Sequence, residues 1–188
     1  MSFIDKIVQS LFNAIVPRTA GFNSVDLTQF SFITIIFYSL LMWIGGGSQS
    51  TAGGIKVNTF AVAMANFISV IKGQNNVRLF NREIESNSIR RASSIIFGSI
   101  LIILIFFVGL VMMEPEISLK GLLFETISAF STVGASLNVT PLLSDGSKIW
   151  LTFLMFIGRV GLITFIMSFI KHTETPKYRL PKDNVIIN

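Results

Sequence analysis

An uncharged apolar run over residues 92–113 constrains the fold of this chain more than any other feature. A helix needs about 20 apolar residues to cross a bilayer, and this run is long enough. A second run, residues 149–170, has the same length and carries Arg159 as its one charged residue. Only 13% of the 188 residues are charged and the mean hydropathy is +0.68, whereas about a quarter of a soluble domain is charged. The sequence therefore predicts an all-α membrane protein.

A third apolar region, residues 30–71, is too long for one straight span. As a single helix it would reach about 60 Å, twice the thickness of the hydrocarbon core. Its middle is rich in glycine, which is a poor residue for a helix interior. We expect the span to break in this middle part, residues 45–54, which we name the 45–54 loop. It consists of Gly45, Gly46, Gly47, Ser48, Gln49, Ser50, Thr51, Ala52, Gly53 and Gly54.

The glycines before Lys56 superficially suggest a phosphate-binding loop. That pattern needs Gly-Lys followed at once by Ser or Thr, between a strand and a helix. Here Ile55 separates Gly54 from Lys56, Val57 replaces the hydroxyl residue, and both flanks are apolar helices. We therefore exclude nucleotide binding by this loop. Lys56 either repels cations inside a pore or, as we favour, extends toward the cytoplasmic interface.

The distribution of charge predicts how the chain is oriented. Residues 72–91 and the tail 171–188 carry more basic than acidic side chains, whereas residues 112–148 are more acidic. Because basic loops stay in the cytoplasm, we expect the first two on the cytoplasmic side of the cell membrane and the third outside. This topology explains the net charge of +5, so no nucleic-acid partner is expected. With no cysteine and one histidine, the chain offers no candidate catalytic or metal site, and we do not expect an enzyme.

Two shorter apolar segments, residues 2–17 and 120–131, are too short to span a membrane. Each ends in a T-x-G sequence, TAG from Thr19 and TVG from Thr132, and a full span follows each one. Irregular backbone at membrane depth must be buried in protein or line water. We therefore interpret the two short segments as re-entrant pore helices.

These segments belong to an internal repeat. The offset that aligns Thr19 with Thr132 also aligns LMWIG at residues 41–45 with LMFIG at residues 154–158. The repeated unit is a pore helix, a T-x-G stretch and a spanning helix, and both copies run in the same direction. Parallel copies of this kind surround an axis along the membrane normal.

The T-x-G stretches are candidates for an ion filter. A dehydrated cation needs oxygen ligands from several directions, and rings of backbone carbonyls supply them. Glycine permits the backbone conformations that direct carbonyls inward. One such tripeptide would be read as an ordinary turn, but two copies in the same context favour a filter.

Arg159 lies in the middle of a predicted span, where an arginine costs about 2.5–3.5 kcal/mol. The repeat places it level with Gly46, so the carbonyls freed by the break, together with the polar side chains from Ser48 to Thr51, are its expected partners. Arg159 is then a structural tether, a gate residue that acts with the loop, or both.

Two more charged residues accompany the T-x-G stretches. Arg18 is expected to pair with a neighbour rather than to bind an ion. Glu125 either adds negative potential near a pore mouth or anchors its short helix, and these alternatives stay open. Asn138 begins a weak glycosylation sequon.

Four segments in this order, PRTAGFNSVDL, GGGSQSTAGGIKVNTFAV, SAFSTVGASLNVTP and FIGRVGLITF, resemble the Trk/Ktr/HKT superfamily of potassium transporters. The TAGFN form is most similar to the membrane subunit of Ktr-type, sodium-dependent uptake systems. The resemblance covers nearly the whole chain. It implies potassium transport, with sodium coupling left open, through four successive units of span, pore helix, filter and span around one pore.

The resemblance assigns this chain to the third and fourth pore units: residues 1–72 without the first span, a cytoplasmic loop over 73–91, residues 92–170, and the tail. It implies that the 45–54 loop obstructs the pore below the filter, with Arg159 beside it. The implied filter, which holds the transported potassium, consists of Thr19, Ala20, Gly21 and Phe22 and of Thr132, Val133, Gly134 and Ala135.

The resemblance also implies partners. The chain begins inside the third pore helix, so we expect a C-terminal fragment that lacks the N-terminal pore units. The family implies a homodimer of the membrane subunit on a cytosolic nucleotide-binding ring, with no cofactor. The alternative is a truncated membrane subunit that does not transport, or an interaction protein.

Overall fold

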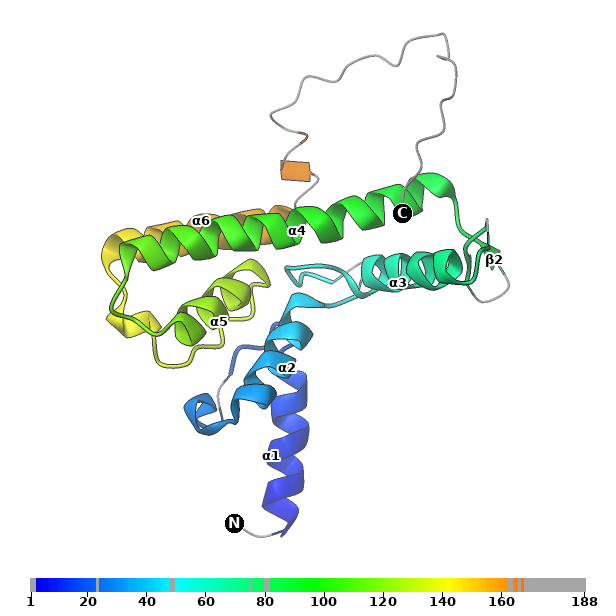
Figure 1. Cartoon of the computed structure of the whole chain (residues 1–188). Helices are drawn as coiled ribbons and strands as arrows, with labels where there is room; N and C mark the ends of the chain where they lie inside the picture. The colour runs from blue at the N-terminus through cyan, green and yellow to red at the C-terminus, as the bar shows by residue number, and fades with distance from the viewer. Residues whose placement is uncertain are drawn as a thin grey trace.

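The computed structural model of the chain describes residues 3–22, 24–47, 50–74, 76–79, 82–161, 164–165 and 167, and this part is mostly helical (Figure 1). The elements in chain order are α1 (Phe3–Ile15), η1 (Leu27–Gln29), α2 (Phe32–Trp43), α3 (Val57–Ile71), β1 (Arg78–Leu79), β2 (Arg82–Glu83), α4 (Ser86–Met113), α5 (Leu119–Phe130), η2 (Thr140–Leu142) and α6 (Asp145–Val160). In Figure 1, α4 and α6 run side by side, and α5 and α3 pack beneath α4 at its two ends.

Within the described part of the chain, α4 is the one helix that is both long enough and apolar enough to cross a membrane. Its 28 residues extend for about 42 Å. We predicted a span over residues 92–113, but the helix begins earlier, at Ser86, because polar residues ahead of the apolar run continue the same helix. It ends at Met113, since Pro115 disfavours helical backbone at Glu114.

The apolar region over residues 30–71 is interrupted. Its first helix, α2, begins after Ser31, whose hydroxyl accepts a hydrogen bond from the N–H of Thr34, and it ends at Trp43. The second helix, α3, begins at Val57. The 45–54 loop lies between them, so neither helix alone has the length of a full span.

Helix α6 differs from the expected span over residues 149–170. It begins at Asp145, after the capping residue Ser144, and it ends at Val160. Gly161 has a φ of 92°, a left-handed conformation that glycine adopts at little cost and that stops a helix. The prediction of one uninterrupted helix through Gly161 is therefore wrong. Most of that span beyond Gly161, and the whole tail 171–188, lie outside the described residues.

The buried core is built around α5, which packs against α2, α4 and α6. Tyr38 of α2 stacks on Phe124 of α5 with the ring centroids 6.1 Å apart. Phe106 of α4 stacks on Trp150 of α6 at 4.5 Å. The second T-x-G stretch thus emerges from a helix that is held by three others.

Helix α1 occupies the same place in the repeat as α5 but is not covered. It projects away from the other helices (Figure 1), and none of its residues is buried. In the second copy the preceding helix, α4, covers α5, and α1 has no counterpart of α4 among the described residues. The apolar side chains that α1 exposes are Phe3, Ile4, Ile7, Val8, Leu11, Phe12 and Ile15.

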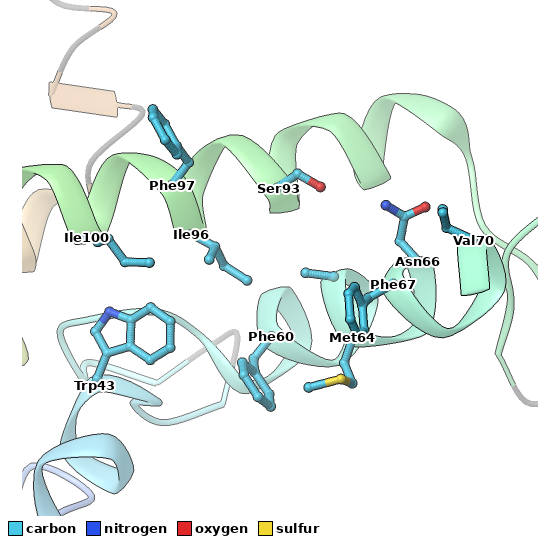
Figure 2. A pocket seen from close by; sticks show the side chains of 11 residues that line it. Trp43, Phe60, Met64, Asn66, Phe67, Val70, Ser93, Ile96, Phe97 and Ile100 are labelled. Carbon is cyan, nitrogen blue, oxygen red and sulfur yellow. The ribbon is translucent and has the colours of Figure 1, made fainter. Parts of the chain in front are cut away.

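An apolar groove of about 490 Å³ lies between α3 and α4 (Figure 2). Trp43 forms one end of it, where its indole Nε1 donates to Ser99 Oγ at 3.3 Å. Ile96 and Ile100 of α4 lie opposite Trp43. The groove thus presents an apolar surface next to the point at which the 45–54 loop leaves α2.

Candidate functional site

The two T-x-G stretches, residues 19–22 and 132–135, share an unusual backbone conformation. Thr19 and Thr132 have φ angles of 69° and 53°, and Gly21 and Gly134 have φ angles of 70° and 85°. Left-handed backbone is rare for a β-branched residue and costs of order 1–3 kcal/mol. Because both threonines adopt it, the two stretches are built to one pattern, and strain of this kind is concentrated at functional sites.

The two stretches also lie side by side. A Cβ atom added to Gly21 would overlap with the carbonyl oxygen of Val133 and would lie 3.5 Å from Cα of Gly134. A Cβ added to Gly134 would meet only Cα of Gly21, at 4.0 Å. Close approach of the two backbones therefore requires glycine at Gly21, whereas backbone conformation requires it at Gly134.

The other residues of the two stretches differ in burial. Val133 and Ala135 are buried in the core. Ala20 is exposed, and Phe22 exposes 71% of its surface. The second stretch is thus anchored by buried side chains. The first stretch exposes its side chains, as does the α1 helix that precedes it.

The 45–54 loop is closed at its base by backbone hydrogen bonds, which we name the neck. The N–H of Gly45 donates to the carbonyl of Ile55 at 2.7 Å, and the N–H of Ile55 donates to the carbonyl of Trp43 at 3.2 Å. A third bond joins the N–H of Val57 to the carbonyl of Gly46 at 3.1 Å. The loop therefore leaves and re-enters the helical region at one point.

The returning end of the loop, beside the neck, contacts the second T-x-G stretch. The N–H of Gly53 donates to Thr132 Oγ1 at 3.0 Å, and a Cβ on Gly53 would overlap with that side chain. Gly54 packs against Ser131, whose buried Oγ has no hydrogen-bond partner among the described residues. The loop thus lies directly against the base of this stretch. Ser48 and Gln49, which we assigned to the loop, lie outside the described residues.

Three cationic side chains donate to backbone carbonyls of the loop and its neck. Arg18 Nη1 donates to the carbonyls of Ile44 at 2.8 Å and Gly45 at 3.0 Å. Arg159 Nη1 donates to the carbonyl of Thr51. The third side chain is that of Lys56, described next. Backbone oxygens that the helix break leaves without helical partners are thereby paired with positive charge.

Lys56 closes the end of the loop. Its Nζ atom donates to the carbonyls of Ser50 at 3.0 Å and Ala52, and its expected place at the cytoplasmic interface stays a prediction. Lys56 is the residue just before α3, and from this position it closes the loop on itself. Arg18 does pair, as expected, but with carbonyls far along the chain. No sequence signal identifies these partners, because the acceptors are main-chain atoms that any residue carries.

Arg159 is positioned by a close helix crossing. A Cβ on the preceding residue, Gly158, would overlap with the carbonyl oxygen of Phe130 at the end of α5. Glycine at this position therefore lets α6 approach the base of the second T-x-G stretch. Arg159 reaches the loop from this crossing point.

Glu125 anchors the chain that follows the second T-x-G stretch. It is 6% exposed, and its Oε1 accepts hydrogen bonds from the hydroxyls of Ser136 and Thr140, the latter at 3.0 Å. Thr140 also bonds to Ser136 at 3.0 Å. Of the two roles left open for Glu125, this geometry favours the anchor.

The segments that follow the two stretches contact each other as well. Asn138 Nδ2 lies 3.5 Å from Asp26 Oδ1. Hydrogen bonds from the hydroxyl and the backbone N–H of Thr28 lower the pKa of Asp26 below its usual value. Asp26 therefore stays ionised at neutral pH. It lies where the chain continues beyond the two stretches.

In the described part of the chain, no cluster of three or more His, Asp or Glu side chains could hold a metal ion. The carbonyl oxygen of Val133 lies against Gly21, and Thr132 Oγ1 accepts the hydrogen bond from the Gly53 N–H.

Comparison with known proteins shows which family the chain is similar to. The model of a family described as TrkH, cation transport protein, matches residues 2–180. The chain is 40% identical over 185 residues to Ktr system potassium uptake protein B of Bacillus subtilis, covering 98% of this chain and 41% of the relative. It is 38% identical to the protein of the same name from Vibrio alginolyticus, covering 94% of this chain and 38% of the relative. It is 31% identical to potassium/sodium uptake protein NtpJ of Enterococcus hirae, covering 99% of this chain and 42% of the relative.

The chain thus spans about two-fifths of the length of these relatives. The matching family consists of transport proteins, in agreement with the sequence-based view that the chain is not an enzyme. The match covers nearly all of the chain, including both T-x-G stretches, the 45–54 loop and Arg159. The chain belongs to the TrkH family of cation transport proteins.

Proposed function

We propose that this chain forms two of the four pore units of a Trk/Ktr-type potassium uptake transporter. The observation that carries the proposal is the pairing of the two T-x-G stretches, which share a left-handed Thr and Gly and lie against each other. Three relatives are named for potassium uptake, and one of these names adds sodium. Potassium is therefore the proposed cargo, and sodium is the second cation to test.

In this proposal the carbonyls of residues 19–22 and 132–135 contribute half of a filter. Carbonyl oxygens replace the water shell of a dehydrated cation, and a ring is complete only when four stretches contribute. The two stretches described here lie on one side of such a ring. The other two come from further pore units.

The contrast between α1 and α5 supports the need for further units. The two helices are equivalent in the repeat, yet most of α5 is buried and no residue of α1 is. The apolar side chains of α1 thus lack the cover that α4 gives α5. We propose that the first span of the third unit and the two N-terminal units provide this cover.

The 45–54 loop is the proposed obstruction of the pore. It lies against the base of the second T-x-G stretch through Gly53 and Thr132, and Arg159 donates to its Thr51 carbonyl. A cation leaving the filter toward the cytoplasm would meet the loop first. Movement of the loop, with loss of the Arg159 hydrogen bond, would open the path.

The assembly and orientation follow the family resemblance. We propose a multi-pass protein of the cell membrane with residues 72–91 and the tail 171–188 in the cytoplasm, because both are basic. The proposed partners are a second copy of the membrane subunit and a cytosolic nucleotide-binding ring. The basic cytoplasmic segments are the parts that such a ring would reach.

The test is uptake by the completed transporter, which we define as this chain preceded by the missing pore units. These units come from the reading frame upstream of Met1 or, failing that, from the Bacillus subtilis relative. Expressed in bacteria without other potassium uptake systems, the completed transporter should restore growth at low potassium and take up rubidium. Membrane insertion is checked by the amount of protein in the membrane fraction. Correct insertion without uptake would instead support the alternative, a non-transporting subunit or an interaction protein.

A further inference from the structure

We propose that Arg18 and Thr132 are positioning residues that couple the T-x-G stretches to the 45–54 loop, so that loop position and cation preference change together. The proposal rests on the proposed function, because it concerns the same pore. It differs from a simple obstruction, in which the loop would alter how many ions pass but not which ions. Each residue is tied to the loop by a separate hydrogen bond.

The first connection runs through Arg18. This residue directly precedes Thr19, whose φ of 69° begins the first stretch. Its guanidinium donates to the carbonyls of Ile44 and Gly45, where α2 ends and the neck begins. A change of backbone conformation at Thr19 therefore displaces Arg18 and, through its two hydrogen bonds, the neck. A movement of the neck displaces the first stretch in the same way.

The second connection runs through Thr132 and reaches the other end of the loop. Its hydroxyl oxygen accepts the hydrogen bond from the Gly53 N–H at 3.0 Å. A lone pair used in this way is not available to a cation at the base of the second stretch. The hydroxyl oxygen has two lone pairs, so a cation bound there and a loop held against Thr132 would share one oxygen atom.

The two connections act on the two ends of the loop, which meet at the neck, since a Cβ on Gly45 would overlap with the carbonyl oxygen of Gly53. The three neck hydrogen bonds fix the base of the loop. Lys56 holds the segment that leads back to the neck, through its hydrogen bond to the carbonyl of Ser50. A movement of the neck therefore changes both connections, and both stretches change with it. Arg159, in contrast, ties the loop to α6 and contacts neither stretch in the hydrogen bonds described.

The experiment compares Arg18→Gln with Arg159→Gln in the completed transporter. Rubidium uptake gives the flux, and the sodium concentration that halves uptake gives the cation preference. Arg18→Gln should raise flux and lower the preference for rubidium over sodium by about tenfold, as for loss of a charged hydrogen bond. Arg159→Gln, which also releases the loop, should raise flux and shift the preference in the same direction, whereas a simple obstruction would change flux alone. Arg18→Lys, which keeps the charge and a donor, should restore part of the preference.

A control separates the hydrogen bond from the charge. Lys6→Gln removes one positive charge from α1, the helix just before Arg18, and should leave the preference unchanged. Thr132→Val, which removes the hydroxyl that accepts the Gly53 N–H, should lower the preference, and Thr132→Ser, which keeps a hydroxyl, should lower it less. An unchanged preference in Arg18→Gln at normal protein level, whether or not flux rises, would overturn the coupling while leaving the proposed function intact. Absence of uptake by the unaltered completed transporter would instead overturn the proposed function, and the coupling with it.

Discussion

Arg159 of α6 donates a hydrogen bond from its guanidinium to the carbonyl oxygen of Thr51 in the 45–54 loop. The contact joins two parts of the chain that the internal repeat places at the same level. It accounts for an arginine within an otherwise apolar segment, because the charge is paired with a backbone oxygen that the helix break has freed.

Replacing Arg159 with glutamine should raise transport by the completed transporter. The loop loses a charged hydrogen bond, so its open position becomes more populated, and rubidium uptake should increase by up to about tenfold. The measurement is initial uptake rate divided by the amount of protein in the membrane. Lys148→Gln, which removes a positive charge from the other end of α6, is the matched control and should have little effect. A rate equal to that of the unaltered protein would show that Arg159 is only a tether.

Replacing Gly134 with serine should weaken the preference for potassium over sodium. A Cβ at Gly134 would make only an ordinary contact, with Cα of Gly21 at 4.0 Å, so the effect arises from its φ of 85°, which costs a non-glycine residue about 1–2 kcal/mol. The backbone then relaxes and moves its carbonyls. Gly47→Ser is the control, because an added Cβ there has no atom within 4 Å and the residue is not in the left-handed region. Rubidium uptake in competition with sodium measures the preference, and an unaltered preference in the Gly134 variant would rule out the filter assignment.

Replacing Gly158 with alanine should destabilise the protein. The added Cβ would overlap with the carbonyl oxygen of Phe130, a backbone atom that cannot turn aside, so α6 must shift away from α5. Overpacking of this kind costs about 1–3 kcal/mol. Gly146→Ala is the control, since its Cβ would meet the flexible end of Met113 at 3.1 Å and helix propensity favours alanine. Thermal unfolding in detergent should show a lower midpoint for the Gly158 variant alone.

The link between the end of α4 and the start of α6 should depend on pH. Hydrogen bonds from Ser144 and from the hydroxyl of Ser147, together with the nearby charge of Lys148, lower the pKa of Glu114 below its usual 4.5. The ionised carboxylate therefore stabilises the fold above pH 4.5, and this stabilisation is lost as the pH falls through the lowered pKa.

The variant Glu114→Gln tests this link. Its unfolding midpoint should lie below that of the unaltered protein at pH 7, and the two should converge in acid. Glu116→Gln, on the exposed turn that follows, should show no such difference. A constant difference between the Glu114 variant and the unaltered protein at every pH would contradict the account.

Sequence patterns were informative wherever a residue type has a backbone consequence. Glycine density predicted a break near residues 45–54, because glycine weakens a helix whatever surrounds it. The same property stopped α6 at Gly161, but there the apolar residues on both sides hid the signal. The start of α4 was missed for a related reason, since polar residues such as Arg90 continue a helix that hydropathy alone would end.

The partners of the cationic residues could not be predicted. Arg18 and Lys56 both donate to main-chain carbonyls, and which carbonyls are within reach depends on the path of the loop rather than on residue types. The repeat did indicate that Arg159 lies near the loop, because its level in the helix follows from the alignment. That Gly21 lies against Val133 is a further tertiary detail that the repeat did not specify.

The central claim is that the 45–54 loop obstructs a pore lined by the T-x-G stretches. Deleting residues 47–51 tests it most directly, and the geometry permits the deletion. A Cβ on Gly46 would lie 2.9 Å from Cβ of Ala52, so these two residues are close enough to be rejoined while the neck is kept. The completed transporter with the shortened loop should take up rubidium faster than the unaltered one at equal protein in the membrane. Uptake that stays the same or falls, with the protein inserted normally, would contradict the claim.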